Sequence, residues 1–130
     1  MIVVDASAAV DWLLQTAAGR RIEERIFAHR ETLHAPHLLD LEVTQVLRRL
    51  AQQGALARSR ADEAIRDLLD MRLTRYPHSV LLPRIWQLRH NYSAYDAAYI
   101  ALAESLRAPL ITRDARLASA STSAANTELF

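Results

Sequence analysis

Short apolar runs alternate along this chain with longer segments in which apolar residues recur at helical spacing. The clearest helical segment is His37–Gln53, and Gly54 is its expected stop. The runs Ile2–Val4 and Leu110–Thr112 are short and apolar, which is typical of strands buried in a parallel sheet. Strands that alternate with helices predict an α/β fold with a central, mostly parallel sheet of four to five short strands and helices on both faces.

The other expected elements are bounded by turn-forming or capping residues. Further strands are expected at Leu33–Ala35, closed by Pro36, at Leu73–Tyr76 and, as an edge strand, at Thr127–Phe130. Neither an internal repeat nor a linker divides the chain, so residues 1–130 are expected to form a single domain. The further expected helices are Ala8–Gln15, Arg20–His29 after a break near Gly19, a helix opened by the capping box Ser59–Asp62 and running through Leu69 and Met71, Ser79–Arg89, Ala94–Leu106 and Ala115–Ala120.

Composition narrows the classes of protein to consider. Of the 130 residues, 51% are hydrophobic, which is enough for a substantial core. The chain has no cysteine, which excludes disulfides, thiolate zinc sites and cysteine nucleophiles and fits a cytoplasmic protein. The first eleven residues carry no basic residue, and Asp5 and Asp11 interrupt their apolar character, so they predict neither a signal peptide nor a membrane span.

Two carboxylates follow predicted strands. Asp5 comes directly after Ile2–Val4, and Asp114 follows the apolar pair Leu110–Ile111 after one Thr and one Arg. In open α/β sheets, ligand sites form outside the carboxyl ends of the strands. Clustered like charges cost free energy unless a cation neutralises them, and Mg²⁺ or Mn²⁺ is the hard, oxygen-seeking cation that fits.

Two further carboxylates lie on predicted helices. Glu42 has Leu38, Leu39 and Val46 as helical neighbours, which puts it on the apolar face of its helix. Asp96 takes the third helical position of the segment Ser93–Asp96, which matches a capping box. Each acid of the four has an ordinary alternative, because Glu42 could reach solvent from the edge of its stripe and the three aspartates could cap helices. Their joint occurrence favours one shared metal site, in which at least one carboxyl should have a raised pKa.

Other polar residues lie next to these acids. The hydroxyl of Ser7 could hold the carboxylate of Asp5 or a metal-bound water, and that of Thr112 could support the site or bind a phosphate. Arg113, adjacent to Asp114, could touch a substrate phosphate or be a solvated charge.

Four sequence segments carry a resemblance to a known family. They are V-D-A-S-A from Val4, L-E-V around Glu42, Y-D-A-A-Y-I-A-L-A from Tyr95 and L-I-T-R-D from Leu110. In this order and at these intervals the chain resembles PIN domains, and more narrowly the VapC toxins of bacterial toxin–antitoxin pairs. The resemblance covers nearly the whole chain. It places Ser7 and Thr112 on the family's supporting hydroxyls and the following residues on its acidic quartet: Asp5, Glu42, Asp96 and Asp114.

The resemblance implies a metal-dependent endoribonuclease that acts on RNA as the toxin of such a pair. It also implies Mg²⁺ as cofactor, with Mn²⁺ as a substitute, the quartet as catalytic metal ligands, a VapB-like antitoxin as partner, and a homodimer. The residues give a separate reason to expect a homodimer, since six apolar side chains on the predicted helices offer more apolar surface than one thin sheet layer should need. These residues are Trp12, Leu13, Ile22, Ile26, Leu56 and Leu68.

Two alternatives stay open at this stage. One is a non-catalytic binding module with the PIN fold. The other is Mg²⁺-dependent phosphotransfer through an aspartyl phosphate, whose enzymes normally use a lysine and a second acid in a D-x-D motif. All 16 basic residues here are arginine, and Asp5 is followed by Ala6 and Ser7, so this alternative is disfavoured.

Overall fold

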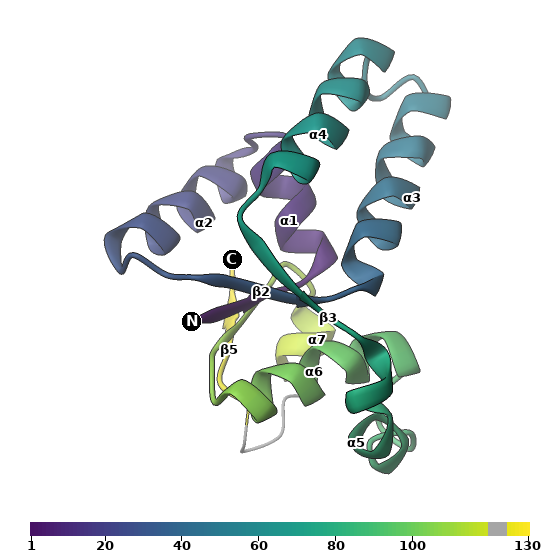
Figure 1. Ribbon diagram of the computed structural model, residues 1–130. Coiled ribbons are helices and arrows are strands. Elements are labelled where there is room, and N and C mark those ends of the chain that lie inside the picture. Colours follow the sequence, from purple (N-terminus) through teal and green to yellow (C-terminus); the bar gives the residue numbers. More distant parts are fainter. Residues whose placement is uncertain (120–124) are drawn as a thin grey trace.

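A five-stranded parallel sheet lies at the centre of the computed structural model, which describes residues 1–119 and 125–130 (Figure 1). The prediction of an α/β fold with a parallel sheet is confirmed, and so are the strands expected near residues 73 and 127. The edge strand ends at residue 129, one residue earlier than predicted. The strands are β1 (Ile2–Val4), β2 (Leu33–Pro36), β3 (Leu73–Tyr76), β4 (Leu110–Thr112) and β5 (Thr127–Leu129).

The order of the strands is β3-β2-β1-β4-β5, so β1 lies in the middle. The chain builds outward from β1 to β2 and β3 on one side, then crosses to β4 and β5 on the other. Val3 lies opposite Leu110, and Val4 lies opposite Ile111. The carboxyl ends of β1 and β4 are therefore neighbours at the point where the strand order reverses, which is where open α/β sheets bind ligands.

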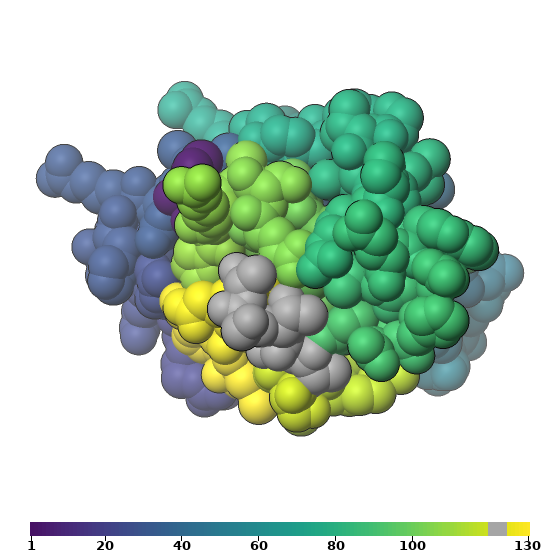
Figure 2. Space-filling view, turned by 90° about the horizontal axis from the view of Figure 1, so that it is seen from below, coloured from purple at the N-terminus to yellow at the C-terminus, as the bar shows by residue number. Residues whose placement is uncertain are grey.

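Helices cover both faces of the sheet (Figure 1). On one side lie α1 (Ala6–Leu13), α2 (Ala17–Ala28), α3 (Leu38–Gln52) and α4 (Arg58–Asp70), with α3 and α4 paired and extending away from the sheet. Figure 2 shows the opposite side, where α6 and the green region before it lie beside the yellow C-terminal residues. This side contains η1 (His78–Val80), α5 (Leu82–Gln87), α6 (Ala94–Leu106) and α7 (Ala115–Ser119).

The core consists of the three central strands and the helix faces that pack on them. Ile2, Leu110 and Ile111 are fully buried, as is Ile100 in the middle of α6. α6 packs against β1, β2 and β4 and is buried from residue 97 to residue 103, which makes it the principal cover of its face. Among the described residues, the helices include none that is both long and apolar enough to cross a membrane.

The first two helices begin earlier than predicted, because each has a side-chain cap. The carboxylate of Asp5 accepts a hydrogen bond from the Ala8 amide and starts α1 at residue 6. The hydroxyl of Thr16 accepts one from the Gly19 amide and starts α2 at residue 17, so Gly19 lies in the first turn and does not break the helix. A Cβ on Gly19 would lie 1.9 Å from the Asp11 carbonyl oxygen, so glycine here permits the close contact of α2 with α1.

Two other helix predictions are wrong in detail. The capping box expected at Ser59 does not form, because α4 begins at Arg58 with Ala57 as a cap that offers no side-chain hydrogen bond. The helix expected at Ser79–Arg89 is divided into η1 and α5, and Pro83, which has no amide hydrogen, lies in the first turn of α5. Ala120, the predicted last residue of the helix after Asp114, lies outside the described residues.

Candidate active site

Four carboxylates line one cavity at the carboxyl ends of β1 and β4. The cavity has a volume of about 420 Å³, and Leu41 and Val46 of α3 contribute apolar side chains to its lining. The structure thus brings together all four acids singled out in the sequence, from positions up to 109 residues apart. The four acids are Asp5, Glu42, Asp96 and Asp114.

Asp5 is the most buried of these acids, with 5% of its surface exposed. Its Oδ1 accepts hydrogen bonds from the Ser7 hydroxyl at 2.7 Å and from the Ala8 amide at 2.9 Å, and its Oδ2 accepts one from the Thr112 hydroxyl at 2.5 Å. Burial raises the pKa of Asp5 and outweighs these three hydrogen bonds, which lower it. Because a carboxylate can accept about four hydrogen bonds, Asp5 keeps capacity for one more ligand.

The two predicted hydroxyls form a network that ties β1 to the loop after β4. Ser7 Oγ accepts a hydrogen bond from the Arg113 amide at 2.9 Å, and Thr112 Oγ1 accepts one from the Asp114 amide at 2.9 Å. Each hydroxyl then donates to Asp5, so the position of Asp5 and the course of this loop are fixed by the same atoms. Thr112 is fully buried, and its hydroxyl donates to Asp5, which favours support of that carboxylate over phosphate binding.

The Arg113 side chain is bound elsewhere. Its Nε donates to Asp11 Oδ2 at 2.7 Å, and its Nη1 donates to the Phe130 carbonyl. The guanidinium therefore links α1 to the end of the chain beyond β5. The sequence left two interpretations open for this side chain, contact with substrate or a solvated charge. In the structure the guanidinium is instead engaged in an ion pair with Asp11.

Glu42 reaches the cavity from α3 and is held by a tyrosine. The Tyr99 hydroxyl of α6 donates to Glu42 Oε1 at 2.7 Å. Burial is the chief cause that raises the pKa of Glu42, and the nearby carboxylates of Asp5 and Asp96 raise it further. A raised pKa was predicted from repulsion between the acids, whereas burial is the larger cause for both Asp5 and Glu42.

Asp96 and Asp114 face each other across an arginine. Asp114 Oδ1 accepts from the Arg116 and Leu117 amides at 2.8 and 3.3 Å, so the predicted cap of α7 is present. Arg116 Nη2 lies 3.4 Å from Asp96 Oδ2 and 3.4 Å from Asp114 Oδ2. Asp96 itself lies in the first turn of α6, where Ser93 caps its amide. Asp96 and Asp114 therefore each lie at the start of a helix and also line the cavity.

The donor set suits a hard divalent cation. All four acids offer oxygen ligands, which Mg²⁺ and Mn²⁺ prefer. Within residues 1–119 and 125–130, however, the side chains as they stand do not bring three acidic or histidine groups close enough to hold an ion. The chemistry of the cavity therefore fits the cation, and Arg116 contacts two of the four acids in the structure as it stands.

Comparison with known proteins decides the family. A model of the PIN domain matches residues 2–122. Ribonuclease VapC9 of Mycobacterium tuberculosis is 48% identical over 117 residues, which are 90% of this chain and 88% of that protein. The chain belongs to the VapC family of PIN-domain proteins.

Solved structures of VapC proteins share the fold. VapC20 of Mycobacterium tuberculosis, described as a Sarcin-Ricin loop cleaving toxin, superposes with a TM-score of 0.67 at 18% identity, over 97% of this chain and 99% of VapC20. A chain of VapBC2 from Rickettsia felis, bound to a DNA fragment from their promoter, gives 0.63 at 12% identity, over 99% of this chain and 98% of that one. At these identities the likeness concerns the fold alone.

Two residues at this VapC-family cavity have contacts that the sequence analysis did not assign. Tyr99 follows Asp96 by three positions, one helical turn, so its spacing was a usable signal for a shared face. Arg116 follows Asp114 by two positions, a spacing that does not place two side chains together on a regular helix. Its contact depends on the turn between β4 and α7, which the sequence pattern does not specify.

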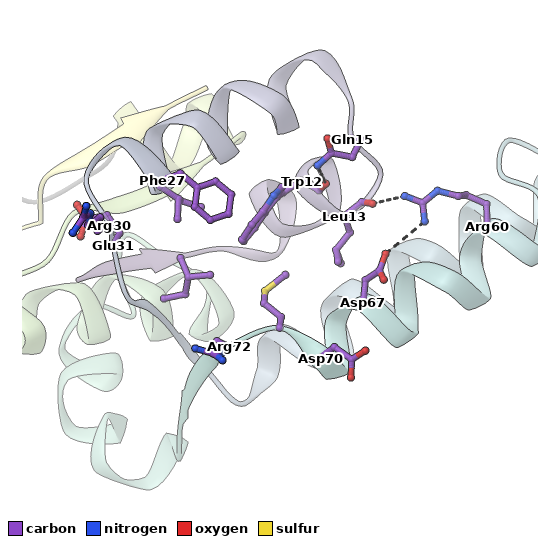
Figure 3. A pocket seen from close by; sticks show the side chains of 13 residues that line it. Trp12, Leu13, Gln15, Phe27, Arg30, Glu31, Arg60, Asp67, Asp70 and Arg72 are labelled. Atoms are coloured by element: carbon purple, nitrogen blue, oxygen red, sulfur yellow. Dashed lines mark hydrogen bonds and ion pairs between the residues drawn. The ribbon is translucent and has the colours of Figure 1, made fainter.

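A second cavity, of about 510 Å³, lies between α1, α2 and α4 (Figure 3). Trp12 and Phe27 form apolar walls, and Arg60 extends from α4 to the Leu13 carbonyl and towards Asp67. Phe27 is 65% exposed. This groove has no lining residue in common with the acidic cavity, so it is a separate surface.

The six apolar residues that suggested a homodimer are mostly not at the surface. Four of them belong to the core, and the other two are partly buried against it. That argument for association is therefore wrong, because α1, α2 and α4 bury these side chains against one another and the sheet. The four core residues are Leu13, Ile22, Ile26 and Leu68, and the partly buried ones are Trp12 and Leu56.

Proposed function

We propose that this chain is a metal-dependent endoribonuclease that acts as the toxin of a toxin–antitoxin pair. The observation that carries the proposal is the single cavity lined by Asp5, Glu42, Asp96 and Asp114, in a chain that is 48% identical to a VapC ribonuclease. The cleaved bond is an RNA phosphodiester, and the reaction is hydrolysis by an activated water. The action is expected in the cytoplasm, which agrees with a chain without cysteine.

Each acid has a defined part in this proposal. A bound Mg²⁺ or Mn²⁺ would polarise the phosphate, activate a water and stabilise the leaving oxygen. Asp5, Asp96 and Asp114 are the residues that would hold it. Glu42 completes the ligand set or orients the attacking water, and its hydrogen bond from Tyr99 fixes the carboxylate for that task. The hydroxyls on Asp5 hold that carboxylate in place.

RNA cleavage should depend on the cation. We expect the metal-stripped protein to leave RNA intact, and Mg²⁺ or Mn²⁺ to restore cleavage, because the cation would supply both the activated water and the charge that stabilises the leaving oxygen. The measurement is gel analysis of structured and unstructured RNAs with Mg²⁺, with Mn²⁺ and with a chelator. An Asp5→Asn protein purified in parallel controls for contaminating nucleases. Cleavage that persists in the chelator, or no cleavage of any RNA with either cation, would contradict the proposal.

We further propose that the groove between α1, α2 and α4 binds a VapB-type antitoxin. The groove has an apolar floor and apolar walls, and charges of both signs lie at its rim. Such a surface suits an amphipathic segment of a partner. The rim contains acidic Glu31, Asp67 and Asp70 and basic Arg30 and Arg72. An expected source is a small adjacent reading frame that encodes a DNA-binding N-terminus and an amphipathic tail.

A homodimer also stays a prediction, now without the support of the six residues named above. The exposed apolar side chains lie elsewhere, and those of Val80, Leu82 and Trp86 are close in sequence around η1 and α5. Such a patch is a surface that a second copy of the chain could cover.

Both associations are tested by sedimentation velocity of the protein alone and with the antitoxin. We expect Phe27→Glu to weaken antitoxin binding by roughly tenfold or more, because an exposed aromatic in a groove is a typical hot spot. The matched control is Leu129→Glu, which places the same charge at an exposed apolar site outside both the groove and the patch around η1 and α5. Equal antitoxin binding by both variants would exclude the groove, and a monomer at high concentration would exclude the homodimer.

A further inference from the structure

Arg116 is the one basic side chain, in the described part of the chain, that the structure places on two carboxylates of the acidic cavity. Its single nitrogen Nη2 contacts Asp96 Oδ2 and Asp114 Oδ2, each at 3.4 Å. Asp114 Oδ2 is the oxygen of that residue that a cation in the cavity would use, since Oδ1 is bound to the first amides of α7. The guanidinium and a metal ion therefore compete for this oxygen and for the charge of both carboxylates.

The contact of Arg116 is suited to be broken. Both distances are at the long end of the hydrogen-bond range, and one nitrogen serves both acids. The Arg116 side chain is 79% exposed, whereas those of Asp96 and Asp114 are 26% and 36% exposed. Exposed pairs of this kind are weak and screened by salt, so a divalent cation on the same carboxylates displaces the guanidinium.

The place of Arg116 in the fold keeps it near the cavity after displacement. Its backbone is fixed at the start of α7 by the hydrogen bond from its amide to Asp114. It also lines a smaller cavity of about 60 Å³ next to the acidic one, together with Asn91 and Ser93, and Asp96 belongs to both cavities. A released guanidinium thus lies at the edge of the site, where the phosphate of a bound RNA would lie against the metal.

We propose that Arg116 is an internal counter-cation that holds Asp96 and Asp114 before metal binds and then binds the substrate phosphate. This inference rests on the proposed function, because it assigns a substrate-binding residue to that same site. An arginine fork matches the oxygens of a phosphate, and its charge offsets the charge that develops there during cleavage. Binding of the metal then releases Arg116 from the two aspartates. The guanidinium can contact the substrate phosphate only after the cation has bound.

The test compares Mn²⁺ affinity with cleavage rate in Arg116→Gln. Titration calorimetry of the metal-stripped, full-length protein with Mn²⁺ should show binding about two- to fivefold tighter than in the unsubstituted protein, because the competitor is gone. Cleavage of RNA at saturating Mg²⁺ should instead be roughly ten- to a hundredfold slower, because the phosphate contact is lost. Arg116→Lys keeps the charge and should restore the Mn²⁺ affinity to within about twofold.

The matched control is Arg66→Gln on the exposed face of α4, which makes the same change in net charge away from the site. Unchanged or weaker Mn²⁺ binding in Arg116→Gln would overturn the competition, and an unchanged cleavage rate would overturn the phosphate contact. Failure of the proposed function has a different signature. In that case the unsubstituted protein itself would bind no Mn²⁺ at these acids, or no variant would cleave RNA although Arg116→Gln tightened Mn²⁺ binding.

Discussion

Replacing Asp5 with asparagine is expected to abolish RNA cleavage while leaving the protein folded. Asparagine keeps the size of the side chain and the oxygen that caps the Ala8 amide, but it loses the charge that a divalent cation needs. The rate should fall by roughly a thousandfold, since a metal ligand supports several kcal/mol of transition-state stabilisation. Single-turnover cleavage at saturating Mg²⁺ measures the loss.

The same substitution should leave stability nearly unchanged in the metal-free protein. Burial raises the pKa of Asp5, which means that the folded protein disfavours its charged form, and a neutral side chain removes that cost. We expect the free energy of unfolding at pH 7 to stay within about 1 kcal/mol of that of the unsubstituted protein. Asp62→Asn, an exposed substitution on α4, is the matched control for both measurements. Full activity in Asp5→Asn would leave the nuclease proposal without its central residue.

Protons and Mg²⁺ should compete for the acidic cavity. Burial raises the pKa of both Asp5 and Glu42, so each keeps its proton to a higher pH in the folded protein than in the unfolded chain. Metal binding requires the ionised forms, and cleavage at limiting Mg²⁺ should therefore rise with pH on the acidic side. A tenfold increase in Mg²⁺ should shift the acidic limb of the rate–pH profile to lower pH by up to about one unit, if one proton is released for each ion bound.

The sign of the stability effect follows from the same pKa shifts. Above the ordinary carboxyl pKa, the folded state binds more protons than the unfolded state at these two sites, so the metal-free protein should lose stability as pH rises through the raised values. Rate–pH profiles at two Mg²⁺ concentrations and denaturation of the metal-free protein across this range are the two measurements. Acidic limbs that superimpose at both Mg²⁺ concentrations would show that these carboxylates do not bind the ion.

The parts of the fold that were predictable are those that local patterns determine. Continuous apolar runs marked β1 and β4, and acids at their carboxyl ends had to meet because parallel neighbours end at the same edge of the sheet. Glu42 was recognisable as a site residue because a carboxylate on the apolar face of a helix is rarely buried without a partner. The Ser93 cap was predicted correctly, whereas the similar pattern at Ser59 does not form a cap, since α4 already begins at Arg58 and Ser59 lies inside the helix.

The parts that were not predictable depend on contacts between distant segments. Periodicity predicts that Ile22 and Leu68 lie on the apolar faces of their helices. It does not predict that these faces of α2 and α4 are buried in one core. The Asp11 pairing of Arg113 joins α1 to a loop about a hundred residues later. Arg116 reaches Asp96 only because the turn after β4 directs α7 towards the first turn of α6.

The central position of β1 also determines when the site can exist during synthesis. Asp5 is made first, yet the hydroxyl of Thr112 and the loop that carries Asp114 come from a strand made near the end of the chain. Arg113, which shapes that loop, is held in turn by the carbonyl of Phe130. A nascent chain on the ribosome therefore contains no assembled acidic cavity until β4 has emerged and paired with β1. The topology therefore delays the appearance of the site until more than a hundred residues have been made after Asp5.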